Sequence, residues 1–186
     1  MDSLQGRALV ASPYLTDPNF LRSVVYILQH DAEGAIGLVL NRPLGTSIGS
    51  LLEDLEGRAF ENDAPLYYGG PVEGGLMLLQ EGRCADESAP AVYLATEQAR
   101  ITEICGSDPT VLPQPRYRLF DGYSGWAAGQ LDAEMRSGGW LVWDIQPNQL
   151  FSDPEELWQL AIKQIGRDIL AGGIDPAKMP KDPAYN

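Results

Sequence analysis

The sequence predicts one α+β domain whose core is a mixed or antiparallel sheet with several packed helices. Three observations lead to this prediction. Short apolar runs recur along the chain, segments with helical periodicity are interspersed among them, and strand and helix do not alternate regularly. A chain of 186 residues fits a single domain, and no repeat or linker divides it. We therefore expect one domain over residues 1–186, with 173–186 as an extended C-terminal tail.

The N-terminus and the cysteines predict a soluble cytoplasmic protein. The first residues lack the basic region and apolar stretch of a signal peptide. No run approaches the ~20 apolar residues that span a bilayer, so no membrane partner is expected. Cys84 and Cys105 are far apart, which is typical of a reducing compartment rather than of a secreted disulfide framework.

The charge balance disfavours direct binding to nucleic acid. The formal net charge is −13, and the 13 basic residues are scattered, whereas phosphate backbones are bound through clustered Lys and Arg. A local basic patch remains open, because Arg116 lies close to Arg118 and Lys178 close to Lys181.

The first strong structural signal is a β-hairpin. Residues 7–11 form a short apolar strand that Ser12-Pro13 ends. Residues 23–29 contain five consecutive β-branched, aromatic or aliphatic residues, which predicts a strand buried on both faces. The turn chemistry of 30–34 then precedes a return strand over 35–40, which Asn41-Arg42-Pro43 ends.

A helix and three strands are predicted in the middle of the chain. Residues 46–55 place apolar side chains at helical spacing, with Ser47 suited to the N-cap and Gly57 to the end. Strands are predicted at 65–68, 76–79 and 91–95. The polar residues 81–90 are expected to form a surface loop.

Two helices with N-cap signals lie in the remaining part of the chain. Thr96 is expected to cap a helix that ends at Gly106, and Ser152 with Glu155 forms a capping box for a helix to about Leu170. The broad apolar set of that last helix predicts that much of it is buried. The other elements are an irregular connection with Pro109, Pro113 and Pro115, a strand at 117–122, a helix at 124–135 and a strand at 140–145.

Several segments, in constant order across residues 4–172, carry a family resemblance. The most specific is 34–43, Gly-Ala-Ile-Gly-Leu-Val-Leu-Asn-Arg-Pro. The others are 6–13, 17–20, 22–24, 69–72, 122–126 and 129–131. Together they resemble the AlgH/YqgE family. Members of that family often carry His after the strand that here ends in Leu79-Gln80, and Ala in place of Ser124, so neither position is a family-wide catalytic group.

The resemblance implies little about activity. The family is mostly uncharacterised, and one branch carries a name that links it to transcriptional regulation of exopolysaccharide synthesis. No enzymatic activity accompanies the pattern.

A triad of Asp17, Ser23 and His30 is disfavoured by spacing. Ser23 and His30 bracket one predicted strand and lie about 23 Å apart at ~3.3 Å per residue, far beyond the ~3 Å of a nucleophile and its base. We therefore expect Ser23 to bond locally and His30 to lie at the end of a hairpin.

Ser124 lies between a predicted strand and a predicted helix, as a nucleophile elbow does. The elbow needs G-x-S-x-G, but Trp126 occupies the last glycine position. The favoured interpretation is a helix N-cap, because a nucleophile also needs a base and His30 is the single histidine.

Phosphate and metal sites have weak support. Residues 69–75 are rich in glycine but lack the Lys of a P-loop, and Glu73 would repel phosphate, so a chain-reversing turn is predicted. One His and two distant Cys exclude the common zinc patterns. The acids at 153, 155 and 156 suit a helix start without an ion. We expect no metal and no cofactor.

Some residues have types that suit recognition better than core packing. They are Asp17, Phe20, Arg22, His30, Asn41, Arg42, Gly69, Gly70, Pro71, Tyr123, Trp126 and Gln130. Structural roles are equally open for several of them: Asp17 and Arg22 can pair, Trp126 can fill the core, and Asn41 can hold a turn.

The sequence thus favours a non-enzymatic regulatory or binding module that acts through a protein or small-molecule partner. The alternatives are a hydrolase that uses Ser124 or an acidic pair, and a DNA-binding regulator.

Overall fold

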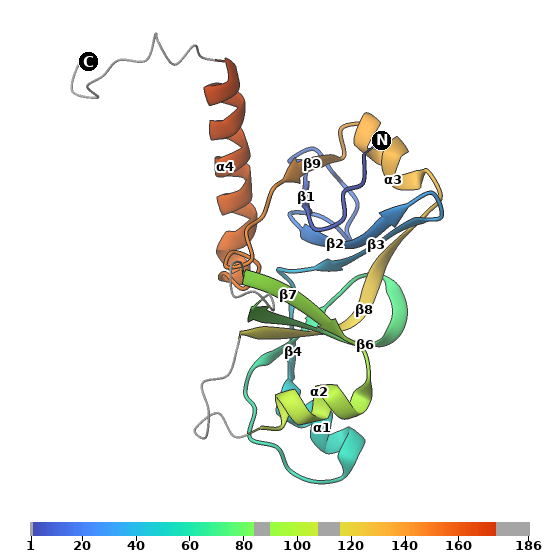
Figure 1. Ribbon diagram of the computed structural model, residues 1–186, viewed down its shortest axis with the longest axis vertical. Helices are drawn as coiled ribbons and strands as arrows, with labels where there is room; N and C mark the ends of the chain where they lie inside the picture. The colour runs from blue at the N-terminus through green and yellow to red at the C-terminus, as the bar shows by residue number, and fades with distance from the viewer. Residues whose placement is uncertain (1, 84–89, 108–115, 174–186) are drawn as a thin grey trace, which may run out of the picture.

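The computed structural model describes residues 2–83, 90–107 and 116–173. In these residues nine strands form one sheet, and four helices pack around it (Figure 1). The main path of the sheet has the order β4-β5-β8-β3-β2-β1-β9, and β6 pairs with both β7 and β8. The β5–β8 pair is parallel and the other pairs are antiparallel. The predicted α+β class with a mixed sheet is confirmed.

The bounds of the elements follow the chain. The strands are β1 (Ala8–Ala11), β2 (Val24–Asp31), β3 (Gly34–Val39), β4 (Pro43–Ser47), β5 (Pro65–Tyr68), β6 (Val72–Arg83), β7 (Pro90–Ala95), β8 (Tyr117–Ala127) and β9 (Trp140–Trp143). The helices are α1 (Ile48–Glu56), α2 (Gln98–Cys105), α3 (Gln130–Arg136) and α4 (Pro154–Gly173).

The predicted hairpin is formed by β2 and β3, which pair from Val25↔Val39 to Asp31↔Gly34. Only the first half of β2 is buried on both faces, because its second half runs out to the exposed turn. A register shift between Ile27 and Gln29 interrupts the ladder near that turn.

The largest difference from the sequence-based expectation lies in β8. A helix was expected from Ser124, but the strand continues to Ala127 and α3 begins at Gln130. Ser124 pairs with Gly37 and Trp126 with Ala35 in β3. This long-range pairing outweighs the local helical spacing. The turn into α3 is made by Gly129, whose φ of 71° favours glycine.

The helix caps are partly as predicted. Ser47 accepts the Ser50 N–H at the start of α1, and Gly57 ends that helix in the left-handed conformation. Thr96 is not the cap of α2, whose N-cap is Glu97. At α4 the Glu155 N–H donates to the Asp153 side chain rather than to Ser152, and the helix begins at Pro154, directly after Asp153.

Other differences concern element lengths. β4 was not predicted, and β6 runs from Val72 to Arg83 and therefore includes part of the expected surface loop. The rest of that loop, 84–89, lies outside the described residues, as do the prolines at 109, 113 and 115. α4 extends to Gly173, and the expected tail beyond it is not described.

The helices cover different parts of the sheet (Figure 1). α1 and α2 lie together at one end and pack on β6 and β8, α3 covers Trp126 and Trp140 on one face, and α4 packs on the opposite face. The expected burial of α4 holds for Leu157, Ala161 and Ile165. Its last turns extend beyond the sheet, and Ile169 and Leu170 are 67% and 65% exposed. No helix in the described part of the chain is long and apolar enough to span a membrane.

Candidate functional site

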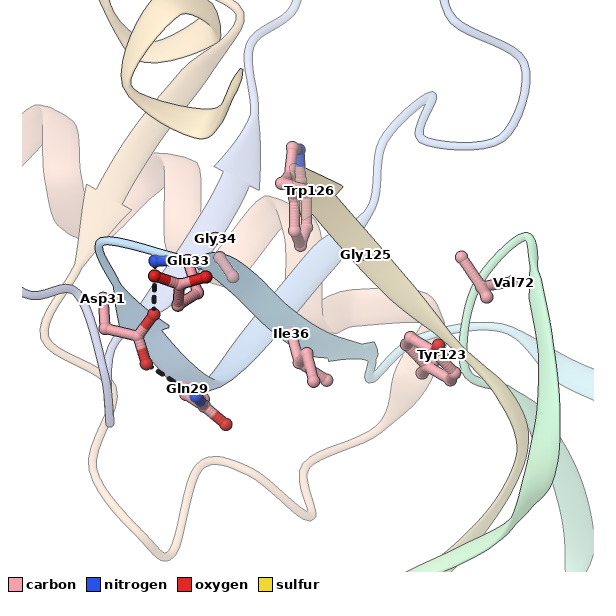
Figure 2. Close-up of a pocket in the computed structure, with 10 residues that line it drawn as sticks. Gln29, Asp31, Glu33, Gly34, Ile36, Val72, Tyr123, Gly125 and Trp126 are labelled. Atoms are coloured by element: carbon pink, nitrogen blue, oxygen red, sulfur yellow. Dashed lines mark hydrogen bonds between the residues drawn. The ribbon is translucent and has the colours of Figure 1, made fainter. Parts of the chain in front are cut away.

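A pocket of about 370 Å³ opens between the β2–β3 hairpin and the second half of β8 (Figure 2). Its ten lining residues come from β2, β3, the turn between them, β8 and the start of β6. We call it the hairpin pocket. Asp31 and Glu33 lie on one side of it and Tyr123 on the other, with Ile36 between them.

The pairing of β3 with β8 leaves the floor of the hairpin pocket open. Ile36 lies opposite Gly125 in the ladder, so the two positions face the same side of the sheet. Gly125 has no side chain to fill that space. A Cβ at this position would lie 3.4 Å from atoms of Tyr123 and Val72, an ordinary contact. Gly34, in contrast, is required by the backbone, because its φ is 140° and a Cβ would approach the Trp126 carbonyl to 2.2 Å.

The turn of the hairpin places two carboxylates at the edge of the pocket. The Gln29 side-chain amide donates to Asp31 at 2.6 Å and the Glu33 N–H at 2.8 Å. These bonds hold the pKa of the Asp31 carboxyl below its usual value, with the Gln29 amide as the main cause. Neither Asp31 nor Glu33 forms an ion pair within the described residues. The edge of the pocket is therefore negatively charged and open.

Trp126 reaches the pocket only with its edge, because most of its ring is buried in a cluster behind the sheet. Phe20 stacks on it at 6.0 Å between ring centroids. The indole N–H groups of Trp126 and Trp140 donate to one carboxylate oxygen of Glu134, at 3.0 and 2.9 Å. Gln130 donates to the other oxygen at 3.0 Å. Sequence reasoning missed Glu134, although its i+4 spacing from Gln130 on a helix was visible.

The predicted residues around the β1–β2 connection hold that connection in place. Asn41 accepts the Val24 N–H at 2.9 Å and donates to the Arg22 carbonyl at 3.0 Å. Arg42 donates to the Pro18 and Leu21 carbonyls, at 3.2 Å each. These contacts agree with the alternative that Asn41 holds a turn.

The suggested pair of Asp17 and Arg22 is not formed in the described structure. The Asp17 carboxylate accepts the Asn19 N–H at 2.8 Å. The Arg22 guanidinium lies 5.8 Å from the centroid of the Trp158 ring. The backbone φ of Arg22 is 52°, a left-handed conformation that is uncommon outside glycine.

Gly69 and Gly70 pack against β8 and do not form an open cradle. A Cβ on Gly69 would lie 2.0 Å from the Gly122 carbonyl, and one on Gly70 would lie 2.3 Å from the Ser124 nitrogen. The Gly69 N–H donates to the backbone carbonyl of Asp121, and the Gly69 carbonyl accepts the Val39 N–H. The predicted chain reversal matches this geometry, and Pro71 follows it at the surface.

The serines and the histidine are separated, and each has its own hydrogen-bond partner. Ser23 directly precedes β2, and His30 lies near the end of that strand. The Ser23 hydroxyl donates to the Phe20 carbonyl at 2.8 Å, and His30 Nδ1 accepts the Leu4 N–H at 3.2 Å. Ser124 is 0% exposed and donates to the Gly69 carbonyl at 3.2 Å. It is neither a helix N-cap nor open to a substrate in this structure.

Arg116 and Arg118 do not form the basic patch that their spacing left open. Arg116 pairs with Glu81 through two bonds of 2.9 and 2.7 Å. Arg118 is 5% exposed. It donates to the carbonyls of Leu40 at 2.9 Å and Leu150 at 2.7 Å, and also to that of Ser152. Burial lowers the pKa of its guanidinium.

The structure therefore divides the predicted binding residues into separate groups. Tyr123 and the edge of Trp126 reach the hairpin pocket, together with Asp31, Glu33 and Ile36, which the sequence did not single out. The remaining residues of the set lie outside its lining. They are Asp17, Phe20, Arg22, His30, Asn41, Arg42, Gly69, Gly70, Pro71 and Gln130.

Comparison with known proteins identifies relatives along nearly the whole chain. A family model described as AlgH-like matches residues 8–170. A UPF0301 protein of Idiomarina loihiensis is 40% identical over 184 residues, covering 94% of this chain and 98% of its own. A UPF0301 protein of Streptomyces coelicolor is 36% identical, covering 100% of this chain and 97% of its own.

Solved structures show the same fold. The AlgH protein of Pseudomonas aeruginosa superimposes with a TM-score of 0.67 at 26% identity, covering 97% of this chain and 96% of its own. A protein of Corynebacterium diphtheriae shares the fold alone, with a TM-score of 0.65 at 23% identity and 86% of each chain covered. The family match and the related sequences together show that this chain belongs to the AlgH-like family.

Proposed function

We propose that this chain is a non-enzymatic binding module that holds the cationic group of a small-molecule or protein partner in the hairpin pocket. One observation carries the proposal: two carboxylates without an ion pair among the described residues share a pocket with an aromatic ring and an aliphatic side chain. A regulatory role in the cytoplasm belongs to the same proposal.

The chemistry of the pocket suits an ammonium or, better, a guanidinium group. A carboxylate accepts charge-assisted hydrogen bonds from either cation, and a planar guanidinium also stacks on an aromatic face. The Tyr123 ring can supply about 0.5–2 kcal/mol of cation–π attraction, depending on how far the cation is desolvated. The net charge of −13 attracts cations towards the molecule.

The direct test is a titration with N-acetylarginine amide, followed by amide chemical shifts. N-acetylcitrulline amide is the control, because it has nearly the same shape without the charge. We expect shifts at the β2–β3 turn and at Tyr123, with a Kd on the order of millimolar for so small a probe. The citrulline compound should bind at least about fivefold more weakly. Equal binding of the two compounds would contradict the proposal.

Two glycine variants provide a matched pair for the same titration. Gly125→Leu places a side chain on the floor of the pocket at a position where a Cβ meets only ordinary contacts. Gly75→Leu is the control, because a Cβ there meets nothing within 4 Å and Gly75 does not line the pocket. Binding should be lost in the first variant and kept in the second. Unchanged binding by folded Gly125→Leu would remove the pocket from consideration.

A further inference from the structure

A second surface lies between α4 and the edge of the sheet, away from the hairpin pocket. It is a groove of about 490 Å³ between β9 with its continuation and α4. Its lining residues are Val142, Trp143, Asp144, Gln146, Gln164, Ile165, Asp168 and Ile169. We call it the edge groove. The strand β9 is the last in the sheet order and pairs only with β1 among the described strands. One side of β9 is therefore open for another strand.

The register shows which backbone groups of β9 face this open side. In an antiparallel ladder, directly opposite residues alternate between hydrogen-bonded and non-hydrogen-bonded pairs. The Ser12 N–H donates to the Gly139 carbonyl at 3.0 Å, so Ser12 and Gly139 form a bonded pair, and the next bonded pairs follow at every second residue of both strands. Leu141 and Trp143, which pair with Val10 and Ala8, therefore bond to β1. The N–H and C=O of Val142 point the other way, to the open edge. Unpaired groups of this kind are the template for β-strand addition.

Trp143 gives an independent sign that the edge groove is incomplete. The residue lines the groove, and its indole N–H is buried with no hydrogen-bond partner in the described structure. Buried polar groups are nearly always paired, so such an N–H calls for an acceptor. A backbone carbonyl that enters the groove can supply one.

The side chains around the edge groove define what fits in it. Ile165 and Ile169 line the α4 side, and Ile169 is largely exposed. Asp144 and Asp168 are the charged residues of the lining. Asp144 pairs with Arg7 at 2.9 Å, whereas Asp168 forms no ion pair with a described residue. Gln146 and Gln164 complete the lining, so the groove combines apolar and polar side chains with a negative charge. Like charges disfavour another acidic chain there.

We infer that the edge groove binds an extended peptide segment of a partner protein that carries a basic residue between two apolar residues on the face turned towards α4. The segment adds to β9 as a strand, with these three residues at alternate positions. Its apolar side chains contact Ile165 and Ile169, and the Lys or Arg pairs with Asp168. One of its carbonyls accepts the Trp143 indole N–H. This inference is independent of the cation proposed for the hairpin pocket.

The test uses a fluorescein-labelled peptide with the sequence Gly-Val-Thr-Lys-Thr-Val-Gly, which places Val, Lys and Val on one face of a strand, and measures anisotropy with the full chain. The same peptide with Glu in place of Lys is the control. We expect the basic peptide to bind at least about tenfold more tightly than the acidic one. Gly125→Leu should not change its affinity, which separates this surface from the hairpin pocket. Equal affinity for the two peptides would overturn the inference.

A substitution at Val142 tests the strand addition itself. Val142→Pro removes an N–H that faces the open edge, which edge strands tolerate. Val142→Thr keeps the N–H and nearly the same shape. We expect about tenfold weaker binding for the proline variant and little change for the threonine variant, with folding of both checked by circular dichroism. Equal binding by the two folded variants would contradict strand addition.

Charge and the other occupants are tested in the same assay. Asp168→Asn should lower the affinity for the basic peptide about fivefold. An unchanged affinity would contradict the proposed charge pair. Self-association that Val142→Pro abolishes would show that a second copy occupies the groove. Binding that appears only after deletion of residues 174–186 would show that the chain's own end occupies it. Either result overturns the choice of a partner peptide.

Discussion

Arg118 and the hairpin pocket show two opposite uses of charged side chains. Arg118 is enclosed, and its guanidinium donates to carbonyls at the end of β3 and in the segment before α4. Asp31 and Glu33 lie at an exposed turn and form no ion pair in the described residues. The first group is enclosed and used by the fold, whereas the second is exposed and bonded only within its own turn. Burial and partners, rather than residue type, separate the two roles.

The largest effect is expected from Arg118→Met. The substitution keeps an aliphatic chain but leaves two buried carbonyls and one partly buried carbonyl without this donor. We expect a loss of about 3 kcal/mol or more in the free energy of unfolding, measured by urea denaturation. Arg116→Met is the matched control, because its pair with Glu81 is exposed and should contribute less than about 1 kcal/mol. Similar losses for the two variants would contradict a difference between the enclosed and the exposed arginine.

Asn41→Ala should have the next largest effect. Its amide joins the start of β2 to the Arg22 carbonyl through two hydrogen bonds. Their loss should lower the free energy of unfolding by about 2 kcal/mol in the same urea assay. Asn41→Asp keeps an acceptor for the Val24 N–H and should retain part of that stability. A folded Asn41→Ala variant with unchanged stability but weakened partner binding would instead assign Asn41 to recognition.

Ser124→Ala should change little. The hydroxyl makes one buried hydrogen bond to Gly69, so the free energy of unfolding should fall by about 1 kcal/mol. Because the side chain is enclosed in β8, esterase and phosphatase screens should give the same result for wild type and variant. Hydrolysis by the wild type that disappears in a folded Ser124→Ala variant would revive the hydrolase alternative.

The smallest effect is a pH dependence at the hairpin. The folded-state pKa of Asp31 is lowered, chiefly by the Gln29 amide, so the ionised carboxylate stabilises the fold. That contribution is present above the ordinary aspartate pKa and disappears as pH falls through the lower folded value. Wild type should therefore be slightly more stable than Asp31→Asn at pH 7, and the two should converge in acid. Thermal melts between pH 7 and pH 2.5 measure this, and a constant difference would contradict it.

Elements with strong local signals were predicted well. The β2–β3 hairpin, β5 and the caps of α1 depend on residues within a few positions of one another, such as Ser47 and Ser50. The helical spacing after Ser124 was misleading, because β8 gains its strand partners from β3, far away in the sequence. At α4 the cap is Asp153 rather than the predicted Ser152, because the helix begins one residue later than the capping box implied.

The candidate site was predicted only in part. Tyr123 and Trp126 stood out by residue type, but nothing local linked them to Asp31 and Glu33. The register of β3 on β8 makes that link, and it also places Gly125 where it leaves the floor open. Asn41 and Arg42 also belong to the predicted recognition residues, and the structure adds that their side chains bond to the β1–β2 connection.

The α+β class, the strong local elements, the acidic charge and the family resemblance follow from the amino-acid sequence, because they depend on composition, short-range spacing and motif order. Which polar groups the fold uses and which stay open depends on tertiary packing. Arg118 meets the Leu40 carbonyl across 78 residues, and the hairpin pocket joins residues from four strands. Such contacts arise only when distant segments pack together, and burial then decides whether a charge is enclosed or available.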